Sequence, residues 1–321
     1  MQECLREFEC SAPGRVKGAR SAAPIPVRAN LCLLALLAPA QAYLLWGPPL
    51  LGTPPWTALL PVILTTTTWS LVHEAMHGVL LPEARASHRA GRLLAVLLGT
   101  AFSLLQRAHL LHHAYSRTED LSEVWECGRE SRLRAILRHY GAVLGGLHLA
   151  EVGLALLATL PRFLRIRLLS ALAPAKDSGR RFVTWALRPD VEAESRVDGA
   201  AALFFLAAAG LLWGADALWL LAAFALRGLA LSLFDNAYHY GTPAGDPLVA
   251  RNHRLAPCLS GAILHFNLHA THHRHPSAPW SALPALAAAA GDPWEGGYWS
   301  RALEQLRGPI RRSDLPPAGG R

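Results

Sequence analysis

Charged residues are scarce in this chain of 321 residues: they make up 17% of the sequence, against 52% for hydrophobic residues. A water-soluble domain carries more charge, so the composition excludes an ordinary soluble protein and favours one embedded in a membrane. Cysteine is also sparse, and its five residues are scattered without any C-x-x-C pair. This spacing excludes a disulfide scaffold and a thiolate metal site, and it favours free thiols in a reducing compartment.

Basic residues outnumber acidic ones, which gives a formal net charge of +8. They lie beside apolar segments and not in basic patches interleaved with aromatic residues. We therefore interpret them as signals of membrane topology and exclude nucleic acid as a partner. Only Lys17 and Lys176 are lysines, and the abundance of alanine, leucine and arginine is typical of a G+C-rich, bacterial gene.

Two pairs of apolar stretches predict two transmembrane helical hairpins. The first pair covers residues 31–51 and 56–72, joined by a turn rich in proline and glycine, and the second covers 200–213 and 217–234. The polar segment 1–30 is too long for the start of a signal peptide, so we expect an uncleaved first span preceded by a cytoplasmic tail. Both hairpins then return the chain to the cytoplasmic face.

Two further apolar stretches have a less obvious place. Residues 91–105 are short for a span and are expected to be re-entrant or interfacial. Residues 141–160 are long enough to cross, but the segment 162–196 that follows contains eight basic and four acidic residues, which favours the cytoplasm. We therefore expect 141–160 to lie at the interface, or to pair with 163–173 as a shallow hairpin.

These patterns predict an all-α integral membrane protein with about four spans, or six if both of these stretches cross, and a cytoplasmic histidine-rich cap. The expected organisation is a cytoplasmic tail over residues 1–30, a membrane domain over 31–300 and a C-terminal tail over 301–321. The expected location is the bacterial cytoplasmic membrane, with the functional site on the cytoplasmic face.

Most of the fifteen histidines fall in clusters. His73 and His77 are four residues apart and face one side of a helix, while the segments 109–113 and 269–273 share the spacing H-x-x-H-H. These clusters supply more candidate ligands than the roughly four that one zinc ion takes, which implies two metal ions. Coordination by nitrogen without thiolates suits iron, copper or zinc. The eight candidates are His73, His77, His109, His112, His113, His269, His272 and His273.

Two other classes of function compete with this interpretation. The segment from His73 to His77 matches the H-E-x-x-H pattern of zinc proteases, in which Glu74 would be the general base, but the other two clusters argue against it. A non-enzymatic metal-binding protein or metal transporter is the second alternative. Transport requires polar groups inside the membrane, and the apolar stretches offer only Arg227 and Glu151 as clear ionisable residues.

The three clusters, in this order around two predicted membrane hairpins, resemble the histidine boxes of the membrane fatty-acid desaturase superfamily, over residues 65–280 or so. The resemblance implies a non-haem diiron centre on the cytoplasmic face, with the eight histidines as iron ligands. It also implies that dioxygen is used to remove hydrogen from an unactivated C–H bond, which needs a redox metal and so excludes zinc. Some acyl desaturases have a further histidine ligand just after the last span, which adds His239.

The same resemblance implies the partners. The substrate would be a fatty acyl lipid or an acyl chain on a carrier, held in the lipid bilayer. The chain has no evident fused cytochrome or ferredoxin-like segment, so a separate electron donor of the ferredoxin, rubredoxin or cytochrome b5 type is expected, together with its reductase.

A hydroxylase or carotenoid ketolase of the same superfamily remains an open alternative. The first cluster, continued by Gly78, closely resembles the first box of bacterial carotenoid ketolases. Both kinds of reaction begin by removing hydrogen, so box spacing does not separate them. The third cluster lacks the additional aromatic and histidine runs of ketolases, which favours acyl desaturation.

Several polar residues near the clusters are candidates for orienting the ligands or a metal-bound water. They are Asp235 and Asn236 before His239, Glu119, Asp120 and Glu123 after the second cluster, and His265, Asn267 and His275 around the third. The isolated histidines are expected to serve packing or to lie on the surface; these are His88, His139, His148 and His253.

Overall fold

The computed structural model describes residues 23–119, 121–172 and 176–317. Within these ranges the chain is almost entirely helical, so the predicted all-α fold is confirmed, and its long apolar helices make it an integral membrane protein. Most of the predicted tail over 1–30, and the last residues 318–321, lie outside the described part. The three described cysteines are all free.

The first predicted hairpin consists of α2 (Val27–Leu51) followed by η1 (Pro55–Leu64) and α3 (Thr65–Met76). Gly52 ends α2 with a left-handed φ of 64°. The second stretch is not one α-helix, because Pro55 precedes it and Pro61 lies in its first half, which winds as a 3₁₀-helix. The regular helix α3 begins only at Thr65 and carries His73 on its last turn.

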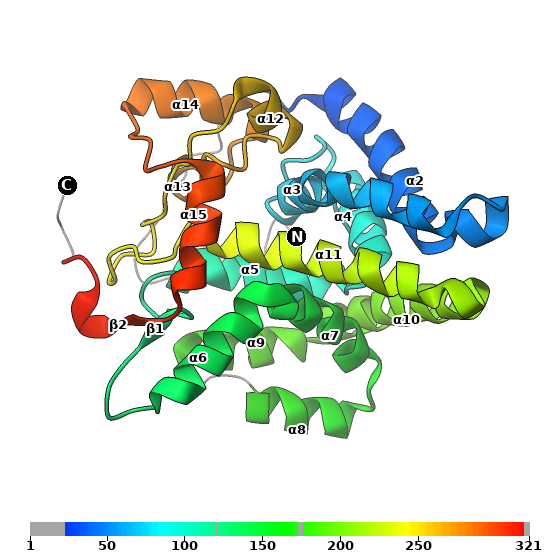
Figure 1. The fold of residues 1–321 in the computed structure, drawn as a ribbon, viewed down its shortest axis with the longest axis horizontal. Helices are drawn as coiled ribbons and strands as arrows, with labels where there is room; N and C mark the ends of the chain where they lie inside the picture. Colours follow the sequence, from blue (N-terminus) through cyan, green and yellow to red (C-terminus); the bar gives the residue numbers. More distant parts are fainter. Residues whose placement is uncertain (1–22, 120, 173–175, 318–321) are drawn as a thin grey trace.

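The second predicted hairpin consists of α10 (Pro189–Trp213) and α11 (Ala217–Asn236). The short turn η3 (Gly214–Asp216) joins them at one end of the molecule (Figure 1), and Gly214 has a φ of 46°. The indole of Trp213 donates to the carbonyl of Leu45, which fixes this end of α10 against α2.

The stretch 91–105 is divided between α4 (Ala84–Leu98) and α5 (Phe102–Tyr115), whose axes differ by 101°. Gly99 ends α4 with a φ of 92°, a conformation that favours glycine. The bend turns α5 so that its later turns, which carry the second histidine cluster, lie close to α3. A bend of this kind belongs either to a broken span or to a re-entrant loop, so the re-entrant or interfacial position expected for 91–105 stays a prediction.

Helix α6 (Arg132–Gly141) continues through η2 (Ala142–Gly146) into α7 (Leu147–Thr159). The backbone is kinked at Gly145, with a φ of 117°, where it passes Gly228 of α11. By length and composition, the described residues include three candidate spans, or four if α4 and α5 together form one. One of the three covers Arg132–Thr159, so the interfacial position expected for 141–160 stays a prediction, as does the number of spans.

The remaining elements are short and lie mostly around the end of the bundle that holds the histidines (Figure 1). Strands β1 (Val124–Trp125) and β2 (Ile310–Arg311) pair in parallel, so part of the predicted C-terminal tail packs on the domain. The other elements are α8 (Arg162–Leu172), α9 (Asp177–Ala186), α12 (Pro257–Ala262), α13 (His269–Arg274), η4 (Trp280–Ala282), α14 (Leu283–Ala290), α15 (Tyr298–Glu304), η5 (Gln305–Arg307) and η6 (Arg312–Asp314).

Close packing between α7 and α10 depends on Gly199. A β-carbon at this position would lie 2.6 Å from the carbonyl oxygen of Ala155 and 3.1 Å from the β-carbon of Ala158. Ala158 of α7 and Val191 of α10 belong to one buried cluster with Leu104 of α5, so the separation of the two helices also affects the packing of α5.

We expect Gly199→Val to destabilise the protein by about 1–3 kcal/mol, because the added side chain forces α7 and α10 apart. The measurement is the thermal midpoint of purified protein in detergent. Gly210→Val on the same helix is the matched control, since a β-carbon there meets nothing within 4 Å. Equal midpoints for the two variants would contradict the packing argument.

Candidate metal centre

The nine histidines predicted as ligands come from four segments of the chain and gather in two groups. Within each group, one nitrogen from every ring lies within 4.8 Å of the others. The first group consists of His73, His77, His109, His113 and His272. The second group consists of His112, His239, His269 and His273.

Each H-x-x-H-H cluster contributes to both groups. On α5, His109 and His113 belong to the first group and His112 to the second. On α13 the arrangement is reversed, because His269 and His273 belong to the second group and His272 to the first. The helical repeat explains this division, since residues four apart share a face and the residue between them points to the neighbouring side.

The spacing of the ring nitrogens fits a common metal ion in each group. In the first group, Nε2 of His109 lies 2.9 Å from that of His77 and 3.1 Å from that of His113. In the second, Nε2 of His112 lies 3.1 Å from that of His239. Two nitrogens that each bind one ion at about 2.1 Å, at a right angle, are roughly 3 Å apart.

Burial keeps these imidazoles neutral, which is the form that binds metal. Burial is the main cause that lowers the pKa of His239, His269, His272 and His273 well below the usual range, and neighbouring histidines add to it. Nε2 of His73 is buried and has no hydrogen-bond partner among the described residues. An orphaned nitrogen aimed at other imidazoles is costly in an apolar interior, and a metal ion would satisfy it.

Backbone carbonyls hold two of the rings in place. Nδ1 of His239 lies 3.2 Å from the carbonyl oxygen of Val249, and Nδ1 of His273 lies 3.2 Å from that of Pro247. A carbonyl only accepts, so each Nδ1 carries the proton and each Nε2 is left free for a metal. Nothing in the sequence signals this role, because any residue provides a carbonyl.

Asn252 fixes the start of α13. Its Oδ1 accepts from the amides of Ala270 and Thr271, and its Nδ2 donates to Thr271 Oγ1. Thr271 Oγ1 in turn donates to Asp292. The sequence reasoning missed Asn252, which lies far from the cluster in sequence and satisfies amides that the helix leaves free.

The histidine groups border a cavity of about 950 Å³. His109, His112 and His269 line it together with apolar side chains such as Trp69 and Leu105. Other parts of its wall carry charged residues, such as Arg134 and Lys176. The cavity therefore combines an apolar wall, exposed imidazoles and a charged region.

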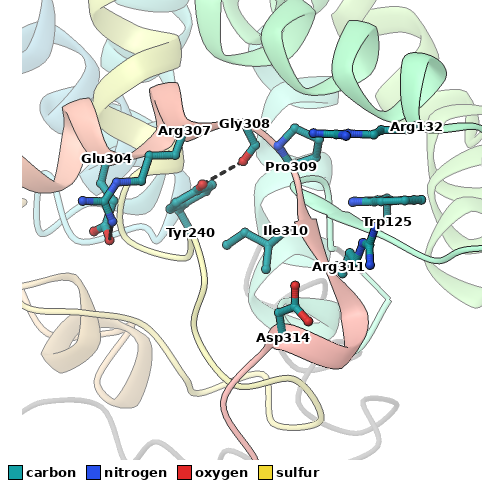
Figure 2. Close-up of a pocket in the computed structure, with 10 residues that line it drawn as sticks. All are labelled: Trp125, Arg132, Tyr240, Glu304, Arg307, Gly308, Pro309, Ile310, Arg311 and Asp314. Carbon is teal, nitrogen blue, oxygen red and sulfur yellow. Dashed lines mark hydrogen bonds and ion pairs between the residues drawn. The ribbon is translucent and has the colours of Figure 1, made fainter.

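A second cavity, of about 630 Å³, lies at the β1–β2 strand pair and has mainly polar walls (Figure 2). The hydroxyl of Tyr240 donates to the carbonyl of Gly308 at 2.7 Å, and the guanidinium of Arg311 lies over the ring of Trp125. None of the ten lining residues is a histidine, so this cavity is not part of the metal centre.

A family model described as fatty acid desaturase matches residues 48–302, which is most of the chain. The chain belongs to the fatty acid desaturase family. No curated protein sequence matches it. Membership agrees with the resemblance carried by the histidine boxes, and it makes the chain a member of a family of oxidoreductases.

Asp235 and Asn236, which precede His239, make contacts with residues other than the ligands in this family member. Asp235 lines the cavity and accepts from the indole of Trp69 at 3.4 Å. The carbonyl of Val249 lies at Nδ1 of His239, the nitrogen that Asp235 was a candidate to orient, and the alternative role of Asp235 at a metal-bound water stays a prediction. Asn236 donates to the carbonyl of Ser232, which lies one turn earlier on its own helix.

The polar residues around the third histidine cluster form hydrogen bonds within the loop that precedes α13 and not with the ligand rings. Nδ1 of His265 lies 2.8 Å from the hydroxyl of Ser260, and that hydroxyl donates to Oδ1 of Asn267. Asn267 also donates to the carbonyl of His253. His275 is exposed, and its amide closes α13. Neither His265 nor His275 belongs to either group.

The acidic residues after the second box bind neighbouring segments. Glu123 pairs with Arg117 at 2.7 Å and accepts from the amide of Gly241, which holds the loop that follows His239. Glu119 accepts from the amide of Ser178 and lines the cavity. Asp120 lies outside the described residues.

The four isolated histidines all lie outside the two groups. His88 contacts Glu194 at 2.8 Å, and His139 contacts the carbonyl of Gln305 at 2.8 Å. His148 contacts Glu151 at 3.1 Å. His253 is stacked on Tyr238, and its two ring nitrogens are buried without a hydrogen-bond partner in the described part of the chain.

Burial of His253 makes the stability of the folded protein depend on pH. Burial lowers the pKa of His253 to about 3, while an unfolded histidine has a pKa of about 6.5. Below about pH 6.5 the unfolded chain therefore binds a proton that the folded protein refuses, so stability falls as the pH falls.

We expect His253→Phe to lose less stability than the wild type between pH 7 and pH 5, by about 2 kcal/mol, because phenylalanine keeps the stacking and takes up no proton. The measurement is the thermal midpoint of both proteins across this range. Parallel curves for the two proteins would show that His253 does not titrate in this way.

Proposed function

We propose that this protein is a membrane-bound diiron oxidoreductase that uses dioxygen and external electrons to desaturate a fatty acyl chain. The observation that carries the proposal is the pair of histidine groups, of five and four imidazoles, beside an apolar cavity. Family membership supports the same reaction class. The nine histidines would hold the two iron ions.

Two iron ions would supply the activated dioxygen that removes hydrogen from an unactivated C–H bond, a reaction beyond the reach of protein side chains alone. The donor set fits this metal, because it is rich in imidazole and free of thiolate. Zinc fits the donors equally but has no redox chemistry.

The chain's own residues position the substrate. The lining residues Leu105, Ala108, His109 and His112 lie along one face of α5, so a hydrocarbon chain beside α5 would pass the imidazoles of both groups. Apolar walls also exclude water from the reacting bond. The lining of the cavity thus favours a long apolar substrate.

The charged part of the cavity suits the polar end of such a substrate. Arg129 and Arg138 are paired with Glu126 and Glu130, while Arg134 has no carboxylate partner among the described residues. An acyl carboxylate, lipid headgroup or acidic acyl carrier would find a cation here.

We place the site on the cytoplasmic face of a bacterial cytoplasmic membrane, where a separate ferredoxin, rubredoxin or cytochrome b5 type donor and its reductase deliver electrons. The support is the basic segment 162–196, which includes α8 and α9, and its bias toward the cytoplasmic side.

A hydroxylase or ketolase is the alternative within the same chemistry, and a non-enzymatic metal-binding protein is the alternative outside it. The zinc protease has less support, because a carboxyl oxygen of Glu74 accepts from the amide of Trp280 at 3.0 Å. Glu74 is also buried and does not line the cavity beside the histidines, whereas a general base must reach a water there.

We expect the purified wild type to contain about two iron atoms per chain. His112→Ala should lower this content, because it removes a nitrogen from a group of only four imidazoles. Elemental analysis checks the result. His275→Ala is the matched control, because it removes an exposed histidine next to α13 and should leave the iron content unchanged. Stoichiometric zinc in place of iron would contradict the proposal.

Mass spectrometry of total acyl lipids and isoprenoids, from cells that express the wild type or His112→Ala, tests the reaction. We expect acyl chains that have lost two hydrogens with the wild type only, because the variant lacks a ligand of the centre. A gain of oxygen with the wild type only would instead identify a hydroxylase or ketolase.

A further inference from the structure

Glu151 is a carboxylate on the wall of an otherwise apolar part of the cavity. Glu151 is 7% exposed. Its neighbours in the cavity wall include Leu147, Ala150 and Leu154, which lie on the same helix, α7. An ionisable side chain on an apolar helix long enough to span a membrane is costly and usually has a binding or transport role. Neither the histidine groups nor the proposed reaction uses this residue.

Glu151 is only partly satisfied by the protein. Oε2 lies 3.1 Å from Nδ1 of His148, one turn earlier on α7. No hydrogen bond joins Oε1 to any described residue, and Nε2 of His148 is buried without a partner among them. A pair that served only to neutralise itself would not leave an acceptor oxygen at the wall of a cavity.

The position of Glu151 along the cavity follows from α5. The carbonyl of Glu151 accepts from the hydroxyl of Thr100, which comes just before α5 begins. At the other end of α5, the carbonyl of Glu119 accepts from Lys176 in the charged part of the cavity. The lining residues Leu105 and Tyr115 are ten residues apart, or roughly 15 Å along the helix.

We propose that the carboxyl group of Glu151 accepts a hydrogen bond from a hydroxyl group on the hydrocarbon chain of the substrate, with His148 holding the carboxyl in place. This inference rests on the proposed function and narrows it: the preferred substrate is a hydroxylated acyl chain. Its acidic end lies in the charged region, its middle passes His109 and His112, and its hydroxyl reaches Glu151.

The physical reason is the cost of an unpaired acceptor. A plain hydrocarbon would cover Oε1 of Glu151 with methyl or methylene groups and remove it from water without compensation. A hydroxyl at the same place donates to that oxygen. The desolvation of Oε1 therefore weakens binding of the plain chain, and the hydrogen bond to Oε1 strengthens binding of the hydroxylated chain.

The test compares matched pairs of ligands, an n-alkanoic acid and the ω-hydroxy acid of the same length, over a series of chain lengths. Each competes with a radiolabelled alkanoic acid for the full-length protein in lipid nanodiscs. At the length that reaches Glu151, we expect the hydroxy acid to bind the wild type roughly tenfold more tightly, about 1.4 kcal/mol. Glu151→Leu should abolish this preference, and Glu151→Gln should keep part of it, because an amide oxygen still accepts.

Glu126→Gln is the matched control, since it changes a carboxylate in the charged part of the same cavity and should affect both members of a pair alike. Equal binding of both members by the wild type at every length, or a preference that survives in Glu151→Leu, would overturn the proposal. If the leucine variant does not fold, the wild type and the glutamine variant still decide.

Binding needs no turnover, so this test is separate from that of the proposed function. If the wild type oxidises acyl chains but shows no preference for the hydroxy acid, the role of Glu151 is removed and the proposed reaction is kept. If the purified wild type contains no iron but still prefers the hydroxy acid, the proposed reaction is removed and the hydroxyl-binding role of Glu151 is kept.

Discussion

The structure depends on bringing neutral imidazoles from four distant segments into two buried groups. Imidazoles removed from water carry a desolvation cost, and Nε2 of His73 and Nδ1 of His269 are buried without a hydrogen-bond partner among the described residues. The arrangement becomes favourable when each group shares a cation, because one ion satisfies several nitrogens. The surrounding fold is the framework that holds these rings in the positions needed to bind the ions.

Three features of the backbone supply this framework. The bend at Gly99 turns α5 toward α3, so that His109 and His113 meet His73 and His77. Carbonyls of the loop after α11 orient rings of the second group. Asn252 fixes the start of α13, which carries ligands for both groups. The first feature joins segments that precede α10, and the other two join segments that follow α11; the two histidine groups bring both parts of the chain together.

The cavity beside the histidines has three chemically different regions. Charged side chains gather beyond the end of α5, imidazoles lie along its second half, and Glu151 lies near its start. A membrane provides hydrocarbon substrates in abundance, so an apolar wall alone selects poorly among them. Polar groups at defined distances from the metal centre are what allow such a cavity to choose both the substrate and the bond that reacts.

The sequence by itself determined the class of protein and its candidate ligands. Low charge and long apolar stretches require helices in a membrane, since lipid leaves no other partner for the backbone. The spacing of the histidines placed them on helix faces, and their repetition identified eight of the nine rings that converge, while His239 came only from the family resemblance. Local periodicity carries this information, because neighbouring turns of a helix are set by the chain alone.

Only the tertiary structure decided how the rings divide between two groups, which carbonyls hold them and where the cavity runs. Val249 and Pro247 act through backbone atoms that every residue has, so no side-chain pattern reveals them. Asp235 is close to His239 in sequence, yet it contacts Trp69. Glu151 and His148 look like an isolated pair in sequence, and only the packing of α7 beside α5 puts the carboxylate at the wall of the cavity. Such contacts join residues far apart in the chain, and their geometry is set by packing and not by local sequence.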